Sequence, residues 1–180
     1  MANRVLKEFR IPFIGLKTGT HEFEFVLEKE FFEAFKYSEI ENAHIDVDVS
    51  LEKQANMMVV DIELSGDVDA VCDRCGDPIQ EEIYTKQRLI VKFGEQSGDP
   101  DDEIIIFGPA EYELDLSHYL YEYAHLALPA KSAHEHPEQC NQEVLNALKK
   151  YSVEDNPEDK WAALKDLHFE DNEPLDDEEE

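Results

Sequence analysis

Apolar and polar side chains alternate without interruption in the stretch AHIDVDVSL, residues 43–51. Side chains two positions apart share one face of an extended chain, so the pattern predicts a strand with one buried and one exposed face. The alternation returns in residues 58–64, and residues 52–56 between the two stretches have a length suited to a hairpin. These residues therefore predict an antiparallel strand pair. The apolar positions of the first strand of this pair are Ile45, Val47, Val49 and Leu51.

A third alternating stretch extends from residue 83 to residue 93. One of its faces is apolar, and the other carries the longest basic stripe in the sequence, formed by Lys86, Arg88 and Lys92. Earlier in the chain, residues 29–37 contain three phenylalanines at the spacing of a short amphipathic helix. We expect this helix to lie on the sheet and to bury its aromatic rings.

The hydrophobic period changes near residue 114. Apolar residues in 116–127 recur at helical spacing, a second helix is predicted after Asn141, and a third is predicted from Pro157 through Trp161. Strands followed by helices are typical of the α+β class. We predict an antiparallel β-rich, bent or barrel-like body at residues 1–113, then two to three short helices at 114–168 packed on the same domain. Residues 169–180 are predicted to be an acidic disordered tail.

The chain is strongly acidic. Its 180 residues include 44 acidic and 16 basic side chains, which gives a formal net charge of −28. Such a charge repels the phosphate backbone of a nucleic acid and favours a basic partner, such as a ribosomal protein or an assembly factor. If the protein contacts RNA directly, the candidate contacts are the basic side chains of the third alternating stretch, together with one nearby arginine. The alternative interpretation is that these side chains form a solvated strand face without an RNA ligand. The candidates are Arg74, Lys86, Arg88 and Lys92.

Three cysteines, an odd number, indicate thiols that are free or bound to a metal rather than a disulfide scaffold. The first residues mix charged and apolar side chains and show no apolar segment typical of a secretion signal. The longest clearly apolar run, residues 104–107, is far shorter than a membrane span. We therefore expect a cytoplasmic protein.

The most specific chemical motif is Cys72-Asp73-Arg74-Cys75-Gly76. Two thiolates separated by two residues can bind one metal ion from a tight turn, and a glycine afterwards allows a positive φ. A third cysteine, together with one of two nearby histidines, would complete a zinc site. The predicted ligands are Cys72, Cys75, His136 and Cys140, with His134 as the substitute for His136. The alternative is a set of reduced thiols packed as small apolar side chains.

Other chemistry has weaker support in the sequence. A redox dithiol of the thioredoxin kind would place the cysteine pair at the start of a helix, whereas Gly76-Asp77-Pro78 predicts a turn toward another strand. The sequence contains none of the standard phosphate-binding, hydrolase, zinc-protease or dinucleotide-binding motifs. We therefore expect a protein that is not an enzyme.

Several segments resemble the YceD family of large ribosomal RNA subunit accumulation proteins. They are Phe9–Phe13, Gly15–His21, Val71–Cys75, Leu126–Pro129, His136–Cys140 and Trp161–Leu167. The resemblance covers roughly residues 3–168. Within the family, the sequence is similar to the variant found in Bacteroidetes-type bacteria. It implies a bacterial cytoplasmic factor needed for normal processing or accumulation of 23S rRNA, without a catalytic activity. Where relatives often carry further cysteines in the second cluster, this sequence has two histidines and one cysteine.

The sequence is compatible with three functions. The first is a non-enzymatic ribosome-biogenesis factor that acts through a protein partner. The second is a metal-dependent nuclease acting on precursor rRNA, although no recognisable set of nucleophile, base and oxyanion donor supports it. The third is an acidic, zinc-stabilised interaction module or chaperone for a basic protein, with no specific role in rRNA accumulation.

Overall fold

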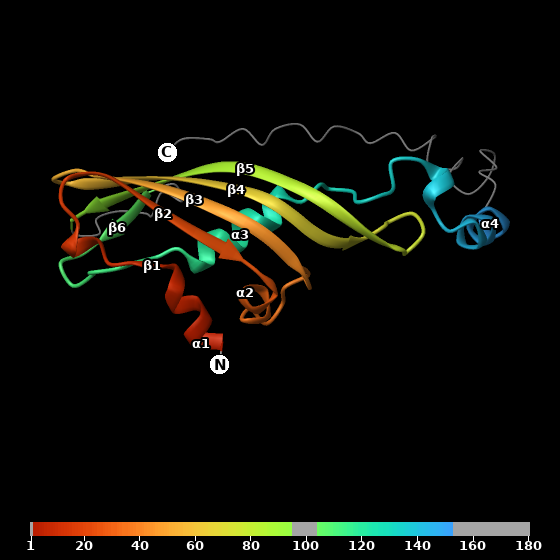
Figure 1. Ribbon diagram of the computed structural model, residues 1–180, viewed down its shortest axis with the longest axis horizontal. Helices are drawn as coiled ribbons and strands as arrows, with labels where there is room; N and C mark the ends of the chain where they lie inside the picture. Colours follow the sequence, from red (N-terminus) through yellow and green to blue (C-terminus); the bar gives the residue numbers. More distant parts are fainter. Residues whose placement is uncertain (1, 95–103, 153–180) are drawn as a thin grey trace, which may run out of the picture. The chain divides into compact units, whose positions relative to one another are not determined.

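The computed structural model describes residues 2–94 and 104–152. Its main feature is an open, curved five-stranded sheet with the strand order β2-β3-β4-β5-β6 (Figure 1). The first four strands are antiparallel, whereas β6 is parallel to β5. The predicted α+β class and β-rich body are confirmed, and of the two predicted shapes the bent one applies, since the sheet does not close into a barrel. The strands are β2 (Gly19–Leu27), β3 (Ala43–Lys53), β4 (Met57–Val71), β5 (Pro78–Phe93) and β6 (Ile104–Phe107).

The predicted hairpin is β3 and β4, joined by a short turn, and the third alternating stretch is β5. Buried residues alternate with exposed ones along both strands of the hairpin, as the sequence predicts. A second, two-stranded sheet joins β1 (Arg10–Ile11) to β7 (Leu114–Asp115) in antiparallel register. This pairing ties the beginning of the chain to the residues just before the main helix.

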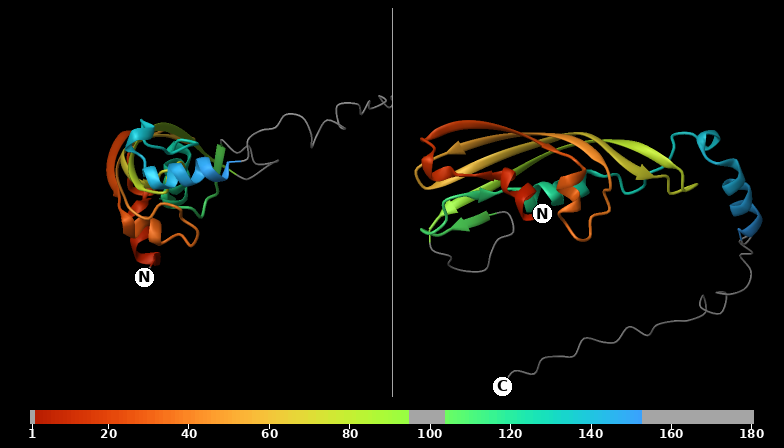
Figure 2. Two further views of the ribbon diagram at one scale, coloured as in Figure 1. Left: turned by 90° about the vertical axis from the view of Figure 1, so that its right-hand side faces the viewer. Right: turned by 60° about the horizontal axis from the view of Figure 1, so that its bottom comes forward.

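Helix α3 (Ser117–Ala127) lies within the concave side of the curved sheet (Figure 2). Its apolar side packs into the core through Leu120 and Ala124, both fully buried. Helix α2 (Lys29–Glu33) is shorter than the predicted helix at 29–37, because the amides of Ala34 and Phe35 close tight turns onto the carbonyls of Phe31 and Phe32. The expected aromatic core is present: the rings of Phe31 and Phe9 lie 4.7 Å apart.

The remaining described helices are short. They are α1 (Ala2–Val5), the 3-10 helices η1 (Leu6–Phe9), η2 (Phe13–Gly15) and η3 (Pro137–Gln139), and α4 (Gln142–Tyr151). Helix α4 is the one predicted after Asn141. The predicted helix around Trp161 and the predicted tail lie outside the described residues. None of the described helices has the length and apolar character that a bilayer crossing requires.

The chain divides into two compact units, Met1–Gln142 and Glu143–Glu180. The first contains both sheets and α3, so the strands of residues 1–113 and the first predicted helix share one core. The packing of residues 143–168 on this body stays a prediction. Everything described below concerns the first unit.

Candidate metal centre

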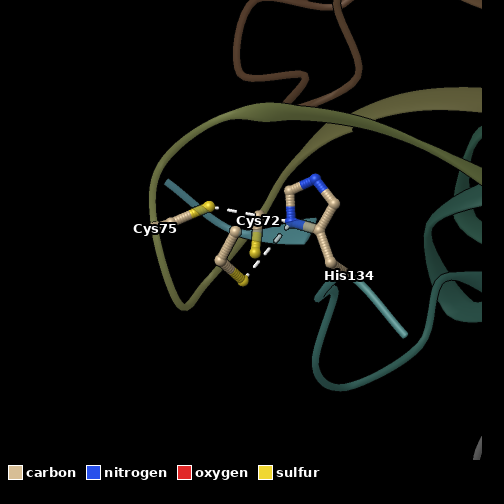
Figure 3. Close-up of side chains that lie close together, drawn as sticks. Cys72, Cys75 and His134 are labelled. Carbon is tan, nitrogen blue, oxygen red and sulfur yellow. Dashed lines mark hydrogen bonds between the residues drawn. The ribbon is translucent and has the colours of Figure 1, made fainter. Parts of the chain in front are cut away.

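The turn between β4 and β5 is built around the cysteine pair. Strand β4 ends at Val71 and β5 begins at Pro78, and the amides of Cys75 and Gly76 both donate to the carbonyl of Cys72, at 3.3 and 2.8 Å. Gly76 has a φ of 80°, a backbone angle that residues other than glycine rarely adopt. This tight turn brings the thiols of Cys72 and Cys75 to one side of the chain (Figure 3).

The segment after α3 supplies the other half of the cluster. It is held against the turn by two hydrogen bonds: the Asp73 amide donates to the carbonyl of Ser132 at 2.7 Å, and the Ser132 amide donates to Asp73 Oδ2 at 2.8 Å. The chain then passes His134 and reaches Cys140 at the end of η3. Residues about 60 positions apart in the sequence therefore lie together.

Four side chains converge at this point: those of Cys72, Cys75, His134 and Cys140. One ligand atom from each lies within 4.8 Å of all the others. The Nδ1 atom of His134 is 3.6 Å from the Sγ atoms of both Cys75 and Cys140. The three cysteines are buried and are not joined by a disulfide. Three thiols and one imidazole form the Cys3His donor set of structural zinc sites, so the residues fit a zinc ion chemically.

His136, the first choice from sequence, lies outside the cluster, and His134 occupies the fourth position. His136 is exposed and directly precedes η3, where its backbone amide donates to the side chain of Gln139 at 3.2 Å. The hydrogen bonds between Asp73 and Ser132 place His134 beside the thiols, two residues after the point of attachment. The spacing of residues within 134–140 does not reveal these hydrogen bonds, so it could not distinguish the two histidines.

The cluster shifts the acidity of its thiols in opposite directions. Burial raises the pKa of the Cys72 thiol, but hydrogen bonds from the backbone of His134, Arg74 and Cys75 outweigh burial and lower this pKa to about 6. Burial raises the pKa of Cys140, a shift that the neighbouring thiols reinforce and that Arg74 opposes. Cys72 is therefore ready to bind a cation as a thiolate near neutral pH.

Arg74 belongs to this cluster. Its Nη1 atom lies 3.6 Å from Cys140 Sγ and 3.5 Å from the carbonyl oxygen of His134. The guanidinium thus donates toward the thiol of one candidate ligand and toward the backbone of another. Its predicted role as an RNA contact stays untested, but its contacts are those of a residue that positions the metal ligands.

Two of the three basic residues in the stripe of β5 pair with acids of β4. Lys86 Nζ lies 2.8 Å from a carboxylate oxygen of Glu63, and Arg88 Nε lies 2.6 Å from one of Asp61. Each pair occupies directly opposite positions of the two strands. Hydrogen bonding to Glu63 raises the pKa of Lys86, and the bond to Lys86 lowers that of Glu63. The fourth candidate, Lys92, is exposed at the far end of β5, opposite Met57.

A profile of the family described as "Large ribosomal RNA subunit accumulation protein YceD" matches residues 60–168. This chain belongs to the YceD family. The matched region contains β5, α3 and all four residues of the cluster, so the candidate metal centre lies within the part shared with YceD relatives. No curated protein and no solved structure matches the chain in the corresponding searches. The family description connects YceD proteins with accumulation of the large-subunit ribosomal RNA.

Proposed function

We propose that this YceD protein is a non-enzymatic ribosome-biogenesis factor that is required for 23S rRNA to be processed or to accumulate, and that it acts through a basic protein partner. The observation that carries this proposal is the family match over residues 60–168. Two further observations support the proposed mode of action: a Cys3His cluster that fits a structural ion, and exposed carboxylates that attract a basic partner.

Zinc is the proposed occupant of the Cys3His cluster. Thiolate and imidazole ligands suit zinc, and the protein supplies all four positions of a tetrahedral site. A site closed in this way leaves no position for a substrate or a reactive water, as in structural zinc centres. The ion would join the β4–β5 turn to the segment after α3. This donor set supports a structural rather than a catalytic role for the ion.

A protein partner is favoured over direct RNA binding by the charges. Lys86 and Arg88 already face carboxylates on β4, so their charges are largely compensated. The sheet face around them also carries Glu22 and Asp48, which line a shallow hollow next to the two pairs. A basic protein such as a ribosomal protein or an assembly factor is attracted to such a surface, whereas RNA is repelled.

Affinity purification of the full chain from its host at low and high salt tests this function. We expect large-subunit ribosomal proteins or assembly factors to be recovered at low salt, to remain after ribonuclease treatment, and to dissociate at high salt as charges are screened. Loss of all partners after ribonuclease treatment would contradict a protein-mediated role. Recovery of basic proteins unrelated to the ribosome would favour an acidic interaction module or chaperone.

Cleavage of precursor rRNA by the purified protein in the presence of Mg²⁺ would overturn the non-enzymatic assignment. We expect no cleavage above that seen with a matched control protein purified in the same way. Loss of any observed cleavage upon substitution of one acidic residue would assign the activity to this chain rather than to a contaminant.

A further inference from the structure

Strand β4 extends beyond its neighbour β3 and leaves a short open edge. β3 begins at Ala43, opposite Val68, and one more backbone bond follows, from the Asp69 amide to the carbonyl of Asn42 at 3.0 Å. β4 continues to Val71, still paired with β5 on its other side. Figure 1 shows that β4 and β5 extend beyond the point where β3 begins.

The backbone of Val71 faces this open edge. In an antiparallel sheet, the backbone groups of successive residues point alternately toward the two neighbouring strands. Asp69 bonds toward the side of β3, and Cys72 bonds to Asp77 on the side of β5. Val71 must therefore direct its N–H and C=O toward the side of β3, where no described backbone group meets them. Its partner position on β5 is Pro78, which has no N–H to contribute.

A groove of about 750 Å³ follows this edge. It is bounded by β4 residues 68–71, by the chain that leads into β3, and by the segment after α3. Its surface is partly apolar: Leu128 and Pro129 line it, and so does Val71, which is 60% exposed. An apolar surface beside an unpaired strand edge is the setting in which an extended peptide adds to a sheet.

Carboxylates surround the groove. Glu39, Glu41, Asp69 and Asp73 all line it and are exposed. Among the described residues, none of the four forms an ion pair with a lysine or an arginine, although Asp73 accepts the Ser132 amide. The groove therefore combines an apolar surface and a free strand edge with uncompensated negative charge.

We propose that this groove binds an extended segment of a basic protein, which pairs its backbone with Val71, between the bonds of Asp69 to Asn42 and of Asp73 to Ser132, and directs lysine or arginine side chains toward the four carboxylates. The proposal rests on the proposed function, because it places the basic partner on a particular surface. The chain's own last residues are an unsuitable occupant: residues 153–180 contain 13 acidic and 2 basic side chains, counted from the sequence, and are repelled by the groove.

Nuclear magnetic resonance of the ¹⁵N-labelled full chain tests the proposal with a defined probe. The probe is an acetylated, amidated peptide of alternating lysine and valine, about eight residues long, close to the length of an ordinary strand. We expect the amide signals of Asp69 and Val71 to shift and the Val71 amide to become protected from exchange. The same peptide with N-methyl groups on alternate backbone nitrogens cannot add as a strand, and we expect it to leave the Val71 amide unprotected.

Charge reversal gives a second, independent arm. The double variant Glu41→Lys, Asp69→Lys alters the groove, and its matched control, Glu24→Lys with Asp46→Lys, makes the same charge change at two exposed positions away from the groove and from the hollow beside Lys86 and Arg88. We expect the groove variant to weaken binding of the probe by about tenfold or more and the control to weaken it far less. Unchanged amide spectra away from each substituted site would verify that both variants are folded.

Equal weakening in both variants, or shifts confined to the exposed sheet face, would overturn the groove as the docking site. Equal protection of Val71 by the N-methylated peptide would overturn strand addition. These results are separable from the test of function: a partner recovered in a salt-sensitive manner, with no effect of the groove variant, would leave the proposed function in place and contradict only this surface.

Discussion

Arg74 lies between the two cysteines of the turn, and its guanidinium contacts both halves of the cluster. It donates toward Cys140 Sγ at 3.6 Å and toward the carbonyl oxygen of His134 at 3.5 Å. Three thiolates and a neutral imidazole on a divalent ion leave one excess negative charge, which a nearby guanidinium compensates. Groups that orient metal ligands in this way commonly contribute a large part of the affinity.

Arg74→Gln is therefore expected to lower zinc affinity by about 10–100-fold while the ion can still bind. The measurement is a competition titration with a chromophoric chelator. Arg74→Lys keeps the charge but loses the planar donor, and we expect an intermediate loss. Unchanged affinity in Arg74→Gln would show that the contacts of Arg74 do not support the metal.

His134 and His136 provide a matched pair of variants two residues apart. His134→Ala removes a ligand, so we expect zinc content to fall well below one ion per chain and the free energy of unfolding to decrease by on the order of 4 kcal/mol. His136→Ala alters an exposed side chain, and we expect full zinc content and near-unchanged stability. The readouts are elemental analysis and denaturant unfolding. The reverse ranking would restore His136 as the ligand.

The three candidate cysteine ligands could be predicted from sequence, whereas the choice between the two candidate histidines could not. The Cys-x-x-Cys spacing is a local property of one turn, and Cys140 was the remaining thiol. The choice between His134 and His136 depends on the long-range hydrogen bonds between Asp73 and Ser132, which no local spacing encodes. For the same reason the acids that pair with Lys86 and Arg88 become visible only in the register of β4 and β5.

At the scale of elements, the backbone of β3 leaves no room for a side chain at Gly66 of β4. A Cβ atom added at this glycine would overlap the carbonyl oxygen of His44 and lie 2.7 Å from the Cα of Ile45, both backbone atoms that cannot move independently. We expect Gly66→Ala to destabilise the protein by about 3 kcal/mol or to disturb the hairpin. Gly15→Ala is the control, because nothing lies within 4 Å of its added Cβ. Chemical denaturation compares the two, and equal stabilities would contradict the close approach.

Helix α3 is expected to make the stability sensitive to alkaline pH. Burial, with smaller contributions from Tyr119 and Glu122, raises the pKa of Tyr123 to about 12. An unfolded tyrosine ionises near pH 10, so the folded state binds this proton more tightly and its contribution is complete below about pH 10. We expect the contribution to be lost between about pH 10 and 12.

Tyr123→Phe should therefore flatten the decline of unfolding free energy between about pH 10 and 12, as measured by urea unfolding at each pH. Tyr37→Phe is the matched control, because Tyr37 is 80% exposed. A decline of equal slope in wild type and Tyr123→Phe would show that Tyr123 ionises at the same pH in the folded and unfolded chain.

Strands β3, β4 and β5 and helix α3 were predictable because each one repeats a period of two or 3.6 over many residues. The two-residue strands β1 and β7 have no such repeat, and their pairing joins residues about one hundred positions apart. The parallel pairing of β6 with β5 is likewise a tertiary contact that no local period encodes. Local periodicity therefore defined the elements, whereas tertiary contacts set the short pairings and the end of α2.

At the scale of the whole molecule, the net charge of −28 is distributed unevenly. Residues 154–180 contain 13 acids and 2 bases, a net −11, and the remaining 153 residues contain 31 acids and 14 bases, a net −17. The body is thus strongly acidic without its last segment. Such a charge favours association with basic proteins and disfavours binding to rRNA itself.

The ratio of mature 23S to 16S rRNA in cells lacking this protein tests its proposed role most directly. We predict that deletion lowers the ratio or lets 23S precursors build up, and that the wild-type chain restores it. A variant with Cys72→Ser and Cys75→Ser, which removes half of the proposed zinc ligands, should restore it poorly. An unchanged ratio and a normal precursor pattern in the deletion strain would contradict a role in large-subunit rRNA accumulation.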